Sequence, residues 1–298
     1  MINLAGFRYR NVLEARGGPI VRLETSDFVV EDRRLFQANA YLRPELYPLR
    51  AKRAVYSEAS GSGTHSSPMV ARFMAISESM ERWAFHAVSK SPNRAAYGFD
   101  IDPMSNGMAA FPGLFASQAR RSAHLEAVER FSLIAWWEGM VAGVSRATEW
   151  PGVSAVVVWP EPQETVVILH KRTADGLYAY GHAAAGDFLG ACRKAIVELA
   201  RHEYVVANYS RAKAIGGVAV EAPTDRLERR SLFFASEEGH ELFVRRLQSR
   251  PTLACPPREV IFDGKIPGPW EKYAHVWRCV FRPVTDRYMS QDETYFLW

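Results

Sequence analysis

The chain has 298 residues, of which 48% are hydrophobic, and a formal net charge of +4 at pH 7. This length can bury a sizeable core, and so slight a charge without any lysine or arginine run argues against a nucleic-acid partner. The cysteines Cys192, Cys255 and Cys279 lie far apart and form no CxxC pair. We therefore expect a cytoplasmic protein with neither a disulfide scaffold nor a structural zinc, and we expect neither a signal peptide nor a membrane span.

The predicted order of elements is mixed, with helices laid on sheet. The first fifty residues are expected to form strands and turns, followed by a Gly/Ser-rich stretch at residues 60–64. Helices are expected at residues 68–88, 117–141, 187–209 and 227–248, and strands at residues 153–159, 165–171, 214–220 and 273–281. No long linker divides this order, so we expect a single domain over residues 1–298, with its motifs in a core of about residues 59–208.

One helical segment occurs twice. Residues 71–83 align with residues 119–131 at an offset of 48, the distance from Glu78 to Glu126. The identical positions are Ala71/Ala119, Arg72/Arg120, Ala75/Ala123, Glu78/Glu126, Glu81/Glu129 and Arg82/Arg130. In a fainter third copy, 72 residues after the second, Ala191, Ala195 and Glu198 match, whereas Arg201 replaces the second glutamate and His202 the arginine.

The spacing of the repeat places its alanines and first glutamate on one helical face. Residues at i, i+4 and i+7 point the same way, and small alanines let a neighbouring element approach closely. Two carboxylates three residues apart repel each other, and burial increases the cost unless a cation lies between them. Three interpretations stay open on this evidence: a solvated helix face, buried structural Glu–Arg pairs, and a metal–nucleotide site.

The surroundings of the repeat resemble the ATP-binding segments of the YcaO superfamily. The second segment is matched by Ser105-Asn106-Gly107-Met108-Ala109-Ala110 followed by Ala119, Ser122, Glu126, Glu129 and Arg130. The first segment is matched by Ser60-Gly61-Ser62-Gly63 followed by Ala71, Glu78, Glu81 and Arg82, and the third by residues 198–201.

The resemblance implies a fold and a ligand. The implied fold is α/β, with a mixed, largely antiparallel sheet, packed helices and an internal pseudo-repeat. The implied cofactors are ATP and Mg²⁺, with the metal bound by Glu78, Glu81, Glu126, Glu129 and Glu198. The nucleotide would be bound by Ser62, Arg82, Asn106, Gly107, Ser122, Arg130 and Arg201. A catalytic base is not identified.

The resemblance also implies an activity, the O-phosphorylation of a peptide backbone amide. In the commonest branch this chemistry cyclodehydrates Cys, Ser or Thr to an azoline in a ribosomally made, post-translationally modified peptide, such as a bacteriocin. Other branches form thioamides or amidines. The implied partners are a precursor peptide, a separate protein that presents it, and a second copy of the chain.

Three positions differ from the superfamily's usual pattern. Ser62 stands where a lysine is usual, Ala75 where a serine is usual, and Arg201 where a glutamine is usual. These differences favour an alternative in which the chain is a non-catalytic subunit that supports an active partner.

A few residues outside the repeat have two interpretations. His182 could act as a general acid or base, or be a hydrogen-bonded structural histidine. Asp187 is expected to cap the third helix, and Trp136 and Trp137 to pack in the core. Arg229, Arg230, Arg245 and Arg246 are expected to form a solvated face.

Overall fold

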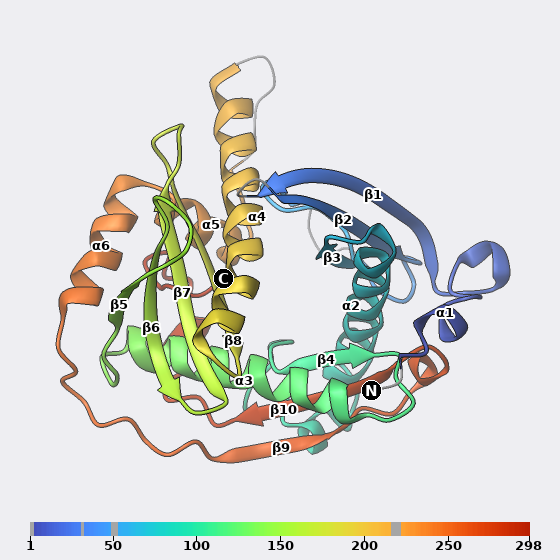
Figure 1. The fold of residues 1–298 in the computed structure, drawn as a ribbon. Helices are drawn as coiled ribbons and strands as arrows, with labels where there is room; N and C mark the ends of the chain where they lie inside the picture. Colours follow the sequence, from blue (N-terminus) through green and yellow to red (C-terminus); the bar gives the residue numbers. More distant parts are fainter. Residues whose placement is uncertain (1–2, 31–32, 49–52, 216–221) are drawn as a thin grey trace. The chain divides into compact units, whose positions relative to one another are not determined.

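A computed structural model describes the chain except residues 1–2, 31–32, 49–52 and 216–221 (Figure 1). The chain divides into two compact units. Unit 1 comprises residues 1–50, 58–127 and 259–282, and unit 2 comprises residues 51–57, 128–258 and 283–298. The expectation of a single domain stays a prediction. No helix among the described residues is both long and apolar enough to cross a membrane.

Unit 1 contains two antiparallel sheets. The first has the order β1-β2-β3, from β1 (Ile20–Val30), β2 (Arg33–Leu42) and β3 (Gly61–His65). Helix α2 (Pro68–Ser89) packs on β2 and β3, and its first turn contains Pro68, where a missing N–H is harmless (Figure 1). The second sheet has the order β4-β10-β9, from β4 (Met108–Phe111), β10 (His275–Phe281) and β9 (Val260–Lys265). A short helix, α1 (Ala5–Arg8), precedes β1.

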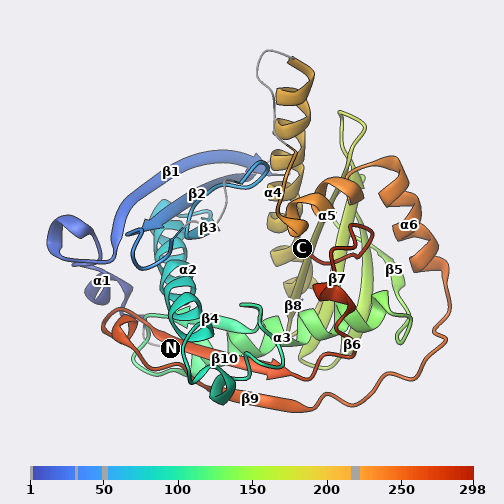
Figure 2. The same ribbon diagram turned by 180° about the vertical axis from the view of Figure 1, so that it is seen from behind.

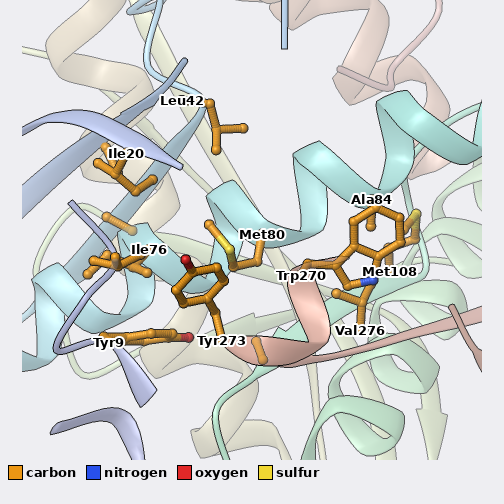
Figure 3. Packing of buried hydrophobic residues seen from close by; sticks show 14 of the residues in the cluster. Tyr9, Ile20, Leu42, Ile76, Met80, Ala84, Met108, Trp270, Tyr273 and Val276 are labelled. Carbon is orange, nitrogen blue, oxygen red and sulfur yellow. The ribbon is translucent and has the colours of Figure 1, made fainter. Parts of the chain in front are cut away.

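The core of unit 1 forms around the inward face of α2 (Figure 3). Ile76, Met80 and Ala84 recur at helical spacing and are at most 3% exposed. They pack with residues from the sheets, from the short 3-10 helix Pro269–Lys272 and from its C-cap Tyr273: Ile20, Leu42, Met108, Trp270, Tyr273 and Val276. Because one face of α2 is fixed in this way, the direction of every side chain along the helix is fixed as well.

Unit 2 is built on one four-stranded antiparallel sheet in the order β5-β6-β7-β8. Its strands are β5 (Val144–Ala147), β6 (Ser154–Glu161), β7 (Glu164–Arg172) and β8 (Tyr178–Ala185). Helix α4 (Phe188–Ile215) packs on β8 and β7, and α5 (Arg226–Phe234) and α6 (Glu237–Gln248) follow it (Figure 2). Helix α3 (Ser117–Trp137) begins in unit 1 and ends in unit 2.

The structure confirms the predicted α/β class with antiparallel sheets and the helices that carry the repeat. Asp187 caps α4 as expected, because its Oδ1 accepts a hydrogen bond from the N–H of Gly190 at 2.7 Å. Trp136 is fully buried and contacts the rings of Phe243 and Phe296, as expected for a core residue.

Other expected elements differ from the structure. The helix expected at residues 227–248 is two helices, separated at residues 235–236. Ser236 caps the second helix, because its Oγ accepts a hydrogen bond from the N–H of Gly239 at 3.2 Å. Arg230 was expected in a solvated face, but it is completely buried. The strand expected at residues 214–220 begins inside α4, and its residues from 216 onward lie outside the described residues.

The two units contain the same close packing of a strand on a helix. A Cβ atom on Gly61 of β3 would lie 2.3 Å from the carbonyl oxygen of Ala75 in α2. A Cβ atom on Gly181 of β8 would lie 2.2 Å from the carbonyl oxygen of Ala195 in α4. Both glycines precede these alanines by the same interval, and both alanines are fully buried. The pseudo-repeat therefore includes a strand as well as a helix.

We predict that Gly61→Ala lowers the free energy of unfolding by about 1–3 kcal/mol, because the added methyl group must push the strand away from α2. Urea denaturation followed by tryptophan fluorescence measures this change. Gly6→Ala is the matched control, since a Cβ atom there meets nothing within 4 Å and helical alanine is favourable. An unchanged midpoint for Gly61→Ala would show that the close approach does not constrain the strand.

Candidate functional site

The carboxylates of α2 have different surroundings. Glu78 accepts hydrogen bonds from the backbone N–H of Ser62 (2.9 Å) and from Nη2 of Arg82 (3.4 Å). Glu81 is only 9% exposed, and no described residue donates a hydrogen bond to its carboxylate. Burial raises the pKa of Glu81 to about 8; Arg82 opposes this shift and the charge of Glu78 adds to it. A buried carboxylate without a donor beside a second carboxylate is an arrangement that a bound cation would stabilise.

Arg82 connects α2 to the loop that precedes β4. Its guanidinium donates to Oγ of Ser105 as well as to Glu78. Burial opposes the charged form of Arg82, but the charges of the surrounding acidic groups, Glu126 of α3 among them, raise its pKa above the ordinary value. The arginine therefore balances negative charge from both glutamate-bearing helices of unit 1.

The loop after Ser105 is fixed by its backbone. Gly107 has a φ of +76°, and its carbonyl oxygen accepts a hydrogen bond from the N–H of Cys279 at 2.7 Å. A Cβ atom at Gly107 would lie 2.1 Å from the carbonyl oxygen of Cys279, so glycine is required at this turn. Asn106 is partly exposed in the same loop, and Ser122 is exposed on α3, one turn before Glu126.

Glu129 in unit 2 is held by β8. Nδ1–H of His182 donates to its Oε1 at 2.7 Å, and the N–H of Ala184 donates to its Oε2 at 2.9 Å. Burial lowers the pKa of His182, but its bond to Glu129 and the charges of Glu129 and Glu198 outweigh burial and raise it. His182 is thus a partner of one candidate ligand and lies within electrostatic range of another.

In the third copy of the repeat, the one remaining glutamate is paired with an arginine. Nη1 of Arg201 donates to Oε1 of Glu198 at 2.9 Å. The N–H of Tyr180 donates to Nδ1 of His202, whose Nε2 donates to Ser231. Burial lowers the pKa of His202 to about 4, so this histidine is neutral where the other copies have an arginine. In α3, Arg130 is buried and lies over the ring of Tyr288 at 4.7 Å.

The structure brings together some of the predicted residues within each unit. Unit 1 joins Ser62, Glu78 and Arg82, and unit 2 joins Glu198 with Arg201. Asn39 was not predicted; its Oδ1 accepts a hydrogen bond from the hydroxyl of Ser62 at 2.9 Å. The link between Glu129 and His182 was also missed, although Gly181 follows Gly61 by the interval that separates Glu198 from Glu78. That shared interval is the signal that could have revealed it.

The described residues fit a magnesium–nucleotide ligand better than a free metal ion. Within the described part of the chain, no three His, Cys, Asp or Glu side chains form a group that could hold a metal ion. Mg²⁺ does not need such a group, since it is usually bound through one or two carboxylates together with substrate phosphates and water. Glu78 and Glu81 offer hard oxygen ligands of this kind, and Glu81 has no competing donor among the residues described.

Comparison of the fold identifies its class. Similar structures include a YcaO protein from Methanopyrus kandleri bound with AMPPCP and Mg²⁺ (14% identity, TM-score 0.53, covering 98% of this chain and 92% of that one). The E. coli microcin synthetase McbBCD complex gives 11% identity and a TM-score of 0.53, covering 87% of this chain and 86% of that one. A heterocyclase in complex with substrate and cofactor gives 11% identity and a TM-score of 0.54, covering 92% of this chain and 51% of that one.

The chain therefore has a YcaO-like fold, as the motifs predicted. No protein-family model and no curated protein sequence matches it. At these identities the likeness defines the fold alone, so the assignment of individual site residues stays a prediction.

We predict that His182 and Glu129 are coupled more strongly at about pH 6 than at about pH 9, by roughly 1–2 kcal/mol. The pKa of His182 is higher in the folded chain than the 6.5 of an unfolded histidine. The stabilisation from its positive charge is therefore fully present below pH 6.5 and is lost as the pH rises through the folded-state pKa. A double-mutant cycle with His182→Gln and Glu129→Gln, measured by urea denaturation in EDTA, gives the coupling directly. Equal coupling at both pH values would contradict a charged pair.

Proposed function

We propose that the chain is an ATP- and Mg²⁺-dependent enzyme that activates a peptide backbone amide by O-phosphorylation. The product we favour is an azoline. In that reaction a Cys, Ser or Thr side chain loses its proton and attacks the preceding carbonyl carbon, and the former amide oxygen takes the γ-phosphoryl group of ATP. Loss of inorganic phosphate and of the amide proton then leaves the C=N bond of the ring, with ADP as the second product.

The observation that carries this proposal is the carboxylate pair on α2. Glu78 and Glu81 lie one helical turn apart, and the buried Glu81 accepts no hydrogen bond from the described residues. A structural Glu–Arg pair would be expected to use Arg82 for both carboxylates, but Arg82 bonds Glu78 and Ser105 instead. The raised pKa of Glu81 shows that its ionised form is uncompensated in this structure, and a cation ligand would supply the missing compensation. The YcaO-like fold, seen with AMPPCP and Mg²⁺ in the protein from Methanopyrus kandleri, supports the same ligand.

The predicted site residues have distinct roles in this proposal. Bound Mg²⁺ would neutralise the charge that develops on the transferred phosphoryl group. The glutamates would hold the metal: Glu78, Glu81, Glu126, Glu129 and Glu198. The polar and basic residues would orient the nucleotide: Ser62, Arg82, Asn106, Gly107, Ser122, Arg130 and Arg201. His182 would orient Glu129, since it donates to that carboxylate.

The partners follow from the same proposal. The substrate would be a precursor peptide, presented by a separate protein in the cytoplasm, and the chain would itself form a homodimer. The similar E. coli microcin synthetase is a complex, McbBCD, and a second structure of that complex has pro-MccB17 bound. These structures support an assembly of this type. A thioamide- or amidine-forming activity would use the same activation of the amide oxygen.

A rival proposal is a non-catalytic subunit with the same fold. The bond from Arg201 to Glu198 favours it, because the third copy of the repeat thereby becomes neutral and offers less charge to a metal. Under this proposal α2 and α3 would keep their carboxylates, but ATP would not be turned over.

We predict that the wild-type chain binds ATP with Mg²⁺ with a dissociation constant below about 1 mM, and that Glu81→Gln weakens binding at least about tenfold. Titration calorimetry with ATP, with and without Mg²⁺, measures both values. Glu238→Gln is the control, since Glu238 is an exposed glutamate on α6, and it should bind as the wild type does. Absence of Mg²⁺-dependent binding in the wild type would refute the enzyme proposal.

Turnover separates the two proposals once binding is established. The enzyme should release ADP and phosphate when it is given its partner protein and a peptide rich in Cys, Ser or Thr. A subunit of the rival type would bind ATP and release neither.

A further inference from the structure

Arg278 occupies a position in β10 where an apolar residue would be expected. It lies on the same face of the strand as Val276 and Val280, and all three side chains are at most 2% exposed. An arginine buried among apolar residues costs free energy unless every part of its charge is compensated. Neighbouring groups must therefore accept hydrogen bonds from its guanidinium, and the positions of these acceptors show which segment Arg278 holds in place.

Three partners of Arg278 are backbone carbonyls of one segment, residues 97–104. Its guanidinium donates to the carbonyl oxygens of Tyr97 (3.0 Å), Met104 (2.8 Å) and Asp102 (2.6 Å). The guanidinium also lies over the ring of Phe99, 3.7 Å from its centroid, which adds a cation–π contact. These contacts span residues 97–104, the segment that leads directly into the Ser105–Asn106–Gly107 loop.

The next residue of β10 holds the far end of that loop. The N–H of Cys279 donates to the carbonyl oxygen of Gly107, and the backbone of Arg278 pairs with Met108 in the sheet. Between these ends, Ser105 accepts a hydrogen bond from Arg82. The loop is therefore fixed before, within and after its three residues, and β10 provides two of the three attachments.

We propose that Arg278 is a positioning residue that holds the loop of residues 105–107 in the conformation that binds the nucleotide; this rests on the proposed function. Arg278 does not touch the ligand itself. It fixes the carbonyls of Asp102 and Met104, so that Ser105 meets Arg82 and Asn106 is presented at the surface. A rigid guanidinium fork suits three carbonyls at fixed angles, which the single ammonium of lysine cannot reproduce.

Hydrogen exchange tests the first part of the proposal without any nucleotide. In Arg278→Lys, backbone amides of residues 99–107 should exchange at least about tenfold faster than in the wild type, while those of the β1–β2 hairpin should not change. Arg246→Lys is the matched control. Arg246 also donates to two backbone carbonyls, those of Trp136 and Val141, but in unit 2. It should leave residues 99–107 unchanged.

Titration calorimetry with ATP and Mg²⁺ tests the second part. Arg278→Lys should weaken binding about tenfold or more, and Arg246→Lys should not, even if both lower the unfolding temperature. Wild-type exchange in residues 99–107, or faster exchange with unchanged ATP affinity, would overturn the proposal. Failure of the proposed function is distinguishable, because the wild type itself would then bind no ATP. In that case Arg278 would have no role in nucleotide binding, and the exchange experiment would still show whether it holds the loop of residues 105–107.

Discussion

The close approach of a strand backbone to a stripe of alanines is the constraint on which the candidate site depends. Gly61 lies so near α2 that a side chain would meet the carbonyl of Ala75, and Gly181 has the same relation to α4. Because the helix face is small and the strand has no side chain there, the strand passes beside the first glutamate of the repeat. The N–H of Ser62 can then donate to Glu78. A glycine and an alanine thus determine where a carboxylate is held.

Charge distinguishes the copies that this packing relates. In the first copy, Arg82 is shared between Glu78 and the loop, so that Glu81 stays buried without a donor among the described residues. In the third copy, Arg201 balances Glu198 and a neutral His202 replaces the arginine. The same backbone arrangement therefore supports a buried carboxyl without a donor in the first copy and a paired carboxylate in the third. Ionising the buried carboxyl of Glu81 is costly, and a bound cation would offset that cost.

The sequence predicted the helices of the repeat well and the strands beside them poorly. Identical alanines and glutamates marked α2 and α3, and those alanines are indeed fully buried. Strand β3 was not predicted, since its Gly and Ser residues are typical of turns. Strand β8 was not predicted either, because Tyr178–Ala185 contains no β-branched residue. Tertiary packing decides these segments, because only the neighbouring helix makes a glycine favourable there. Buried arginines were missed for a related reason. Arg230 and Arg278 bind backbone carbonyls far away in the sequence, which no local pattern records.

The departures from the YcaO pattern do not weaken all candidate ligands equally. The serine at position 62 still binds Glu78, because that bond uses its backbone N–H and not its side chain. Ala75 is fully buried beneath Gly61, so it belongs to the packing and not to the ligand shell. Arg201 is different, since it adds a positive charge that pairs with Glu198. The first two changes are therefore compatible with nucleotide binding, and only the third reduces the negative charge available to a metal. The balance between an enzyme and a supporting subunit thus depends on the third copy of the repeat.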